Sequence, residues 1–221
     1  MGRIQGGGGG GAGRPSLLLV ALGLPALVPA LGGLLPGEAA DEGVAVRGPL
    51  VAAHSTGAVP EHTGGFGEPD CSFCHFDGEL DQEPGTFELA GLPEDGWVPG
   101  REYELVLTLS HPDLVLAGFQ LAVRFASGEL EGEQAGDLAA GRGQQTETPT
   151  RSRVRYLGHT AEGTEPDRDG ERSWSFRWTA PEEVGAGPVR FNASGNAADG
   201  DGSEFGDLVY TLELDLPPAG D

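Results

Sequence analysis

The only two cysteines of the chain lie two residues apart, and a histidine directly follows the second: Cys71, Cys74 and His75. This C-x-x-C-H spacing is typical of covalent c-type haem attachment. Two thiols at this spacing add to the vinyl groups of one haem, and the adjacent imidazole is held over the iron as an axial ligand. We therefore expect Cys71 and Cys74 to bind haem c covalently and His75 to be the proximal ligand. Aromatic side chains in this part of the sequence could shield the porphyrin edge: Phe73, Phe76 and Trp97.

Two other uses of the same residues stay open. In an oxidising compartment Cys71 and Cys74 could form a local disulfide, although a two-residue gap makes a small, strained ring. Together with His75 they could also supply three ligands to zinc. Structural zinc sites usually draw on a second paired cluster, and the sequence contains no further cysteine.

The sixth iron position is restricted by composition. The single methionine is Met1, which excludes His/Met ligation and leaves a second histidine or an open position. His159, at the end of an expected strand, is our first choice for the distal ligand, and His111 is the second. His54 and His62 rank last because they lie in an expected linker. Ligation by two histidines would predict a low reduction potential and electron transfer.

Composition favours a loop-rich β domain. The chain of 221 residues is 38% hydrophobic and contains 39 glycines, which suits short, alternating strands. Its net charge of -22 excludes nucleic acid as a partner, because a phosphate-binding surface must be basic. The sequence contains no G-x-S-x-G motif and no phosphate-cradling loop. We therefore expect an electron carrier or a binding module rather than an enzyme.

The N-terminal part resembles an export signal. Arg3 and Arg14 precede an apolar run at residues 16–35, and small residues follow it. We expect residues 1–40 to be the export segment and residues 41–70 to be a flexible linker. The mature protein is then expected to be periplasmic, secreted or at the cell surface, with no stable membrane span.

The remaining residues, 71–217, are expected to form one all-β domain. Segments in which apolar residues recur at every second position predict strands at 86–89, 102–109, 117–126, 153–158, 173–179, 188–194 and 208–216. Residues 127–151 are polar and rich in glycine, which predicts a long loop with one weak strand at most. About seven half-buried strands separated by turns predict an Ig-like antiparallel β-sandwich.

Four segments together resemble a known family. They are a T-G-x-x-G-E run leading into C-x-x-C-H at 63–75, G-F-Q-L at 118–121, S-W-S-F-R-W-T-A-P at 173–181, and A-S-G-N-A-A-D-G-D-G-S followed by G-D-L-V-Y at 193–210. Their order and spacing resemble the bacterial Reelin-like domain described as a choice-of-anchor domain, which is related to the eukaryotic Reeler domain. The resemblance covers about residues 57–216. It implies an Ig-like β-sandwich on an exported protein.

The acidic segment before the last expected strand has part of the spacing of a calcium loop, through Asp199, Asp201 and Asp207. It lacks the closing glutamate and the flanking helices of an EF-hand. A Gly/Asp turn between two strands explains these residues, and we do not expect calcium.

Our leading hypothesis is an exported monohaem c-type electron-transfer module that exchanges single electrons with other periplasmic or surface redox proteins. The alternative is an extracellular adhesion or structural-interaction domain with a local Cys71–Cys74 disulfide and no haem.

Overall fold

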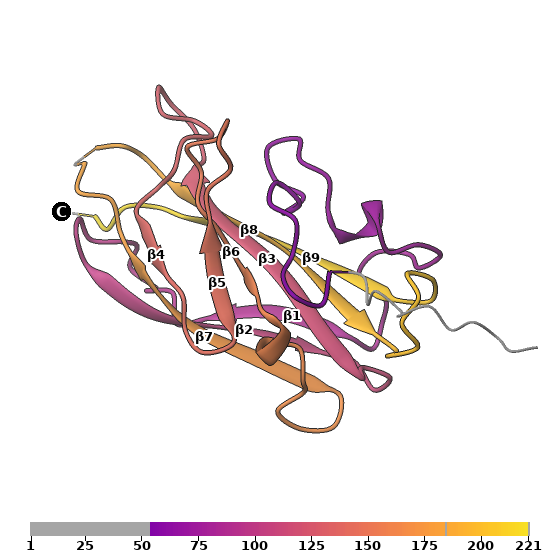
Figure 1. Ribbon diagram of the computed structural model, residues 1–221. Coiled ribbons are helices and arrows are strands. Elements are labelled where there is room, and N and C mark those ends of the chain that lie inside the picture. Colours follow the sequence, from indigo (N-terminus) through magenta and orange to yellow (C-terminus); the bar gives the residue numbers. More distant parts are fainter. Residues whose placement is uncertain (1–53, 184, 221) are drawn as a thin grey trace, which may run out of the picture. The chain divides into compact units, whose positions relative to one another are not determined.

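The computed structural model describes residues 54–183 and 185–220 (Figure 1). The predicted export segment at 1–40 lies outside these residues. Within them, the chain folds into nine strands and two short 3₁₀ helices. The four-stranded sheet has the order β1 (Thr86–Ala90), β2 (Glu102–Ser110), β7 (Glu171–Thr179), β4 (Asp137–Ala139). The five-stranded sheet has the order β5 (Gln144–Glu147), β6 (Tyr156–His159), β3 (Leu116–Phe125), β8 (Val189–Ala198), β9 (Leu208–Leu216).

The two sheets pack face to face through the apolar side chains at every second position. On β2, Leu105 and Leu107 are fully buried while Glu104 is exposed, as the alternation predicts. The sheets meet through aromatic contacts, with the Phe119 and Trp174 rings 4.5 Å apart and the Trp178 and Phe191 rings 5.0 Å apart. Every paired strand is antiparallel. The predicted antiparallel β-sandwich is therefore confirmed.

The strand count differs from the prediction of about seven because residues 127–151 contain two strands rather than one at most. β4 has three residues, and only Leu138 among them is buried. β5 has the sequence Gln-Gln-Thr-Glu and pairs with β6 at the edge of its sheet. An exposed edge strand without apolar residues is held by backbone hydrogen bonds, so it carries no hydrophobic period.

The outer face of the five-stranded sheet is covered, and this determines where the site lies. Polar residues that point away from the core on β3 and β8 are buried: Gln120, Arg124, Asn192, Ser194 and Asn196. Residues 54–80, indigo to purple in Figure 1, run along this side of the domain. The Gln120 side chain accepts a hydrogen bond from the His62 N–H at 2.7 Å and donates one to the Val59 carbonyl at 2.6 Å. Of the expected linker at 41–70, residues 41–53 lie outside the described residues, and residues 59–65 contact the sheet.

Trp97 lies far from the role considered for it in the sequence. Its side chain is fully buried in the core, and its backbone pairs with Pro217 and Ala219 near the end of the domain. It is not among the residues that line the candidate site described below. In the part of the chain that the structure describes, no helix is long and apolar enough to cross a membrane.

Candidate functional site

The C-x-x-C-H motif forms a tight helical turn. The 3₁₀ helix η1 (Cys71–Phe73) is capped by the Asp70 side chain, which accepts a hydrogen bond from the Ser72 N–H at 2.8 Å. The N–H groups of Cys74 and His75 both donate to the Cys71 carbonyl, at 3.2 and 2.9 Å. Residues at i, i+3 and i+4 of a helical turn lie on one side of it. The local fold therefore presents both thiols and the imidazole to one space.

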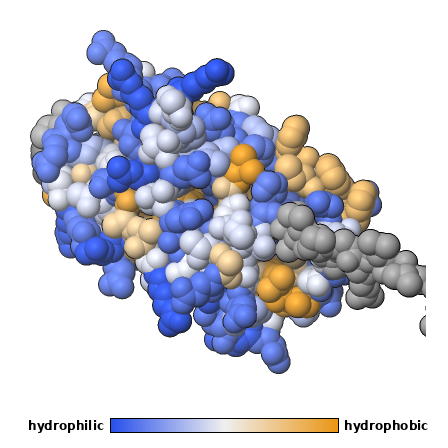
Figure 2. All heavy atoms as spheres, in the orientation of Figure 1, coloured by the Kyte–Doolittle hydropathy of each residue, from blue (hydrophilic) through white to orange (hydrophobic). Residues whose placement is uncertain are grey.

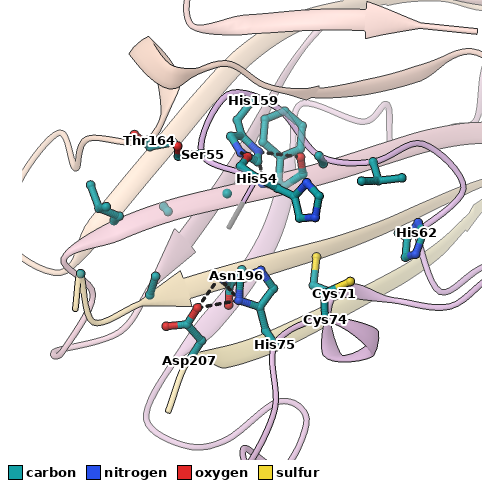
Figure 3. A pocket seen from close by; sticks show the side chains of 18 of the residues that line it. His54, Ser55, His62, Cys71, Cys74, His75, His159, Thr164, Asn196 and Asp207 are labelled. Carbon is teal, nitrogen blue, oxygen red and sulfur yellow. Dashed lines mark hydrogen bonds and ion pairs between the residues drawn. The ribbon is translucent and has the colours of Figure 1, made fainter. Parts of the chain in front are cut away.

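That space is a pocket on the outer side of the five-stranded sheet, with about 840 Å³ between its walls, part of it open to solvent. One wall is the turn with Cys71, Cys74 and His75, and the opposite wall includes His54 and His159 (Figure 3). Apolar residues complete the lining: Ala58, Val59, Leu116, Ala117, Phe119 and Ala198. The pocket thus brings the three predicted haem-attachment residues together with the predicted first-choice distal histidine.

His75 is held by a buried carboxylate that the sequence analysis did not connect with it. Its Nδ1 lies 2.6 Å from Oδ2 of Asp207, whose side chain is 2% exposed. The Asn196 amide donates to the same oxygen at 2.9 Å. Because a carboxylate accepts, His75 carries its proton on Nδ1 and its Nε2 is left as the free lone pair. Histidine ligands of metal ions are oriented in this way.

The two thiols differ in their surroundings. The Cys71 N–H donates to the Ser194 hydroxyl at 3.0 Å, which ties the turn to β8. Burial raises the pKa of the Cys71 thiol to about 11, so the group is neutral at pH 7. Both cysteines are half-buried and their sulfurs are not bonded to each other. Figure 3 shows both sulfurs directed into the pocket, below the His54 ring.

The four other histidines have different positions. His159 is 6% exposed, and its Nδ1 lies 3.0 Å from the Phe119 N–H nitrogen while its Nε2 lies 3.1 Å from the His54 carbonyl oxygen. Burial lowers the pKa of His159, which favours this neutral, doubly hydrogen-bonded ring. His54 and His62 also line the pocket, whereas His111 does not. Binding of iron by His159 would require its ring to leave the His54 carbonyl.

A buried ion pair holds the segment that leads into the turn. Arg124 Nη2 lies 2.7 Å from Oε1 of Glu68, and their side chains are 5% and 13% exposed. Glu68 also accepts hydrogen bonds from the Tyr156 hydroxyl and, at 2.6 Å, from the Thr63 hydroxyl. Burial, followed by the hydrogen bond to Glu68, raises the pKa of Tyr156 above its usual range. Thr63 and Glu68 are the first and last residues of the T-G-x-x-G-E run, so this run is a clamp for the segment.

Gly65, one of the three glycines between Thr63 and Glu68, is required by close packing. A Cβ atom on Gly65 would lie 2.1 Å from Cγ of Asn192, so only glycine allows the segment to lie this close to β8. The T-G-x-x-G-E run in the sequence did not by itself predict this close approach at Gly65.

The acidic loop between β8 and β9 is folded by its own side chains. Asp199 accepts from the Asp201 N–H at 2.9 Å, and Asp201 accepts from the Ser203 N–H at 2.7 Å. Asp207, the last member of the expected calcium-like spacing, instead faces His75. In residues 54–183 and 185–220 no three His, Cys, Asp or Glu side chains form a group that could hold a metal ion on their own. A haem iron would not need such a group, because the porphyrin supplies four of its ligands.

Comparisons with known proteins give similarity of fold type only. No family model matches the chain, and no curated protein matches it. Among solved structures, the chain is similar to the human F-spondin reeler domain, with 19% identity and a TM-score of 0.44 over 64% of this chain and 94% of that one. The Reelin-N domain of F-spondin gives 20% identity, a TM-score of 0.40, and coverage of 67% and 95%. A cohesin module from Clostridium perfringens shows 12% identity and a TM-score of 0.39, and the match covers 62% of this chain and 96% of that one. At these TM-scores the Reelin-like relationship stays a prediction.

Proposed function

We propose that this protein is an exported monohaem c-type electron-transfer module, in which a β-sandwich carries one haem on its outer face. The observation that carries the proposal is the arrangement around His75. Two unbonded thiols and an imidazole share one pocket, and a buried carboxylate fixes the imidazole proton on Nδ1. This donor set fits a haem that is attached by two thioethers and ligated by one histidine.

Each residue has a defined task in this proposal. Cys71 and Cys74 would hold the haem covalently, each by addition of its S–H group across one vinyl group. No oxidant is needed for this addition. Asp207 keeps the proton on Nδ1 of His75, which leaves Nε2 as the only iron ligand that this ring can offer. Asn196 donates to Asp207 and keeps the carboxylate in place.

The bound group would supply one-electron chemistry, and the chain would supply the binding site and its electrostatics. Burial raises the pKa of the Cys71 thiol to about 11, so this thiol stays neutral at pH 7 and is a poor nucleophile. The proposed role is therefore electron exchange with other redox proteins outside the cytoplasm.

Two histidines are candidates for the sixth iron ligand, and they differ in burial. His159 is the first choice from sequence, and it would give up its hydrogen bond to the His54 carbonyl on binding iron. His54 lines the same pocket with an exposed ring that Figure 3 shows directed towards the cysteines. We expect low-spin iron if either ring binds. Loss of the low-spin spectrum in His159→Ala but not in His54→Ala would assign His159, and the opposite result would assign His54.

The first experiment is a pyridine haemochrome spectrum of the protein expressed with a c-type maturation system. We expect an α-band typical of two saturated thioether links and a mass increase of one haem that survives acid–acetone extraction. The Cys71→Ser/Cys74→Ser variant is the matched control and should be colourless. A colourless parent protein, with Cys71 and Cys74 joined in a disulfide by mass, would reject the haem proposal in favour of an adhesion or structural-interaction domain.

A further inference from the structure

Exposed apolar side chains gather around the opening of the pocket. Eight large apolar residues are exposed in the described part of the chain, and five of them belong to this region: Val59, Phe73, Phe76, Val115 and Phe205. We call these five the pocket mouth. Val59 lines the pocket, Phe73 ends the helix η1, Phe76 directly follows His75, and Phe205 packs on Phe76 with ring centres 5.7 Å apart. Figure 2 shows that the face in view is largely hydrophilic and carries several separate apolar patches.

Val115 belongs to the same region through the acidic loop. A Cβ atom on Gly200 would lie 2.7 Å from Cγ1 of Val115, and Gly200 lines the pocket. The side chain of Phe73 is 67% exposed and that of Phe205 is 57% exposed. Isolated apolar residues on a surface are ordinary, but a group of them around a pocket marks an interaction site.

Acidic residues lie next to the residues of the mouth and the pocket lining in the chain. We call the following residues the acidic rim, since each adjoins a residue of the mouth or the pocket lining in sequence: Glu61, Asp77, Asp199, Asp201 and Glu204. Residues 54–80, 111–119 and 196–208 contain no arginine or lysine. In the described residues none of the five forms an ion pair, whereas Arg190 on β8 pairs with both Glu213 and Asp215.

We infer that the pocket mouth and the acidic rim together form a docking surface for a redox protein whose own cofactor is ringed by lysine or arginine. This inference rests on the proposed function, because electrons would pass through the mouth. An apolar centre within a ring of one charge is the usual anatomy of a transient interface, with the ring steering encounter. A second copy of this chain does not fit, because it would bring an identical acidic rim and a net charge of -22 against the first.

The test uses the full exported protein and two forms of one probe, lysine-rich mitochondrial cytochrome c and the same protein with its lysines acetylated. Acetylation removes the lysine charge and leaves the rest of the probe in place. Isothermal titration at low ionic strength should show binding of the native probe and loss of binding of the acetylated one. Asp77→Asn/Asp199→Asn/Asp201→Asn should weaken binding of the native probe by about tenfold.

The control variant removes the same number of charges from a remote surface. Glu88, Glu94 and Glu104 are exposed carboxylates on or near β1 and β2, and their triple replacement by Gln should change the dissociation constant by less than about twofold. Equal weakening by the two triple variants would show attraction by net charge alone and would overturn the inference, as would absence of binding by the parent protein.

The apolar centre is tested separately. Phe73→Ser/Phe205→Ser should weaken binding by a further several-fold, with Val98→Ser, which is 39% exposed and is not part of the mouth, as the matched control. A haemochrome spectrum of each preparation separates the two proposals. Binding that depends on the acidic rim in a protein without haem would reject the electron-transfer proposal and keep the docking surface. Binding that does not depend on the acidic rim in a protein with haem would keep the electron-transfer proposal and reject the docking surface.

Discussion

The clamp between Glu68 and Arg124 gives the most direct test of how the sequence builds this site. In Glu68→Gln the side chain keeps its size and loses its charge, so Arg124 stays 5% exposed without a counter-charge. Breaking a buried ion pair by removing one partner typically costs about 3–5 kcal/mol. For a domain of this size we therefore expect a fall in Tm of about 6–20 °C.

The measurement is urea unfolding monitored by tryptophan fluorescence. The parent protein and every variant are compared in the haem-free form. Glu102→Gln is the control, because Glu102 also pairs with an arginine, Arg177, but at 3.3 Å and with both side chains more than half exposed. Such a pair contributes at most about 1 kcal/mol. Glu68→Gln/Arg124→Met removes the buried charge as well as its partner and should recover part of the lost stability.

The result that would refute this reasoning is a Glu68→Gln variant that is no less stable than Glu102→Gln. In that case the residues before the turn would be held by packing alone. A second readout concerns the site itself: weakening of the clamp should expose the turn and speed alkylation of Cys71, and unchanged alkylation in a destabilised variant would show that the turn is held independently.

Three further predictions concern single groups. Because burial raises the pKa of Cys71 from 9.0 to about 11, iodoacetamide should modify it about a hundredfold more slowly at pH 8 in the folded haem-free protein than in the urea-unfolded chain, and equal rates would contradict this. The lowered pKa of His159 means that the unfolded chain binds more protons than the folded one below about pH 6.5, so stability should fall as pH drops through this range. His159→Asn should flatten the urea midpoint between pH 7 and 5 relative to the parent, and an unchanged slope would exclude His159 as the cause. In the haem-loaded protein Asp207→Asn should raise the reduction potential by removing the charge behind His75, while Asp199→Asn at an exposed position should leave it unchanged.

The sequence was most informative where one face of a strand meets the core. Alternation on β2 and β7 marks Leu105, Leu107 and Trp174 as buried, and they are. It failed for β5, whose four polar residues at a sheet edge have no apolar period to detect. The spacing of the motif was enough to predict that the side chains of Cys71, Cys74 and His75 lie together, because residues at i, i+3 and i+4 of a helical turn lie on one side of it.

The rest of the site could not be predicted, because alternation assigns the polar face of a strand to solvent. Asn192, Ser194 and Asn196 follow each other at every second position on β8, which predicts exposure, yet all three are buried beneath residues 62–75. Local periodicity describes one strand and contains no information on which distant segment covers it. The signal that was present is compositional: four uncharged polar or small residues in a row, Asn192 to Gly195, are unusual for a solvent-facing strand.

The strand register that buries the core side chains of β8 also sets the positions of the site residues on its other face. Phe191 and Ala193 point into the core from β8, and the residues between and beyond them point to the turn. A slip of one residue would reverse every side chain of the strand, so that Ser194 would leave the Cys71 N–H and Asn196 would leave Asp207. In the β8–β9 hairpin Ala197 pairs with Leu208. Asp207, the residue before Leu208, therefore lies immediately before β9, where its carboxylate contacts His75. The same apolar contacts that stabilise the fold therefore fix the carboxylate behind the predicted iron ligand.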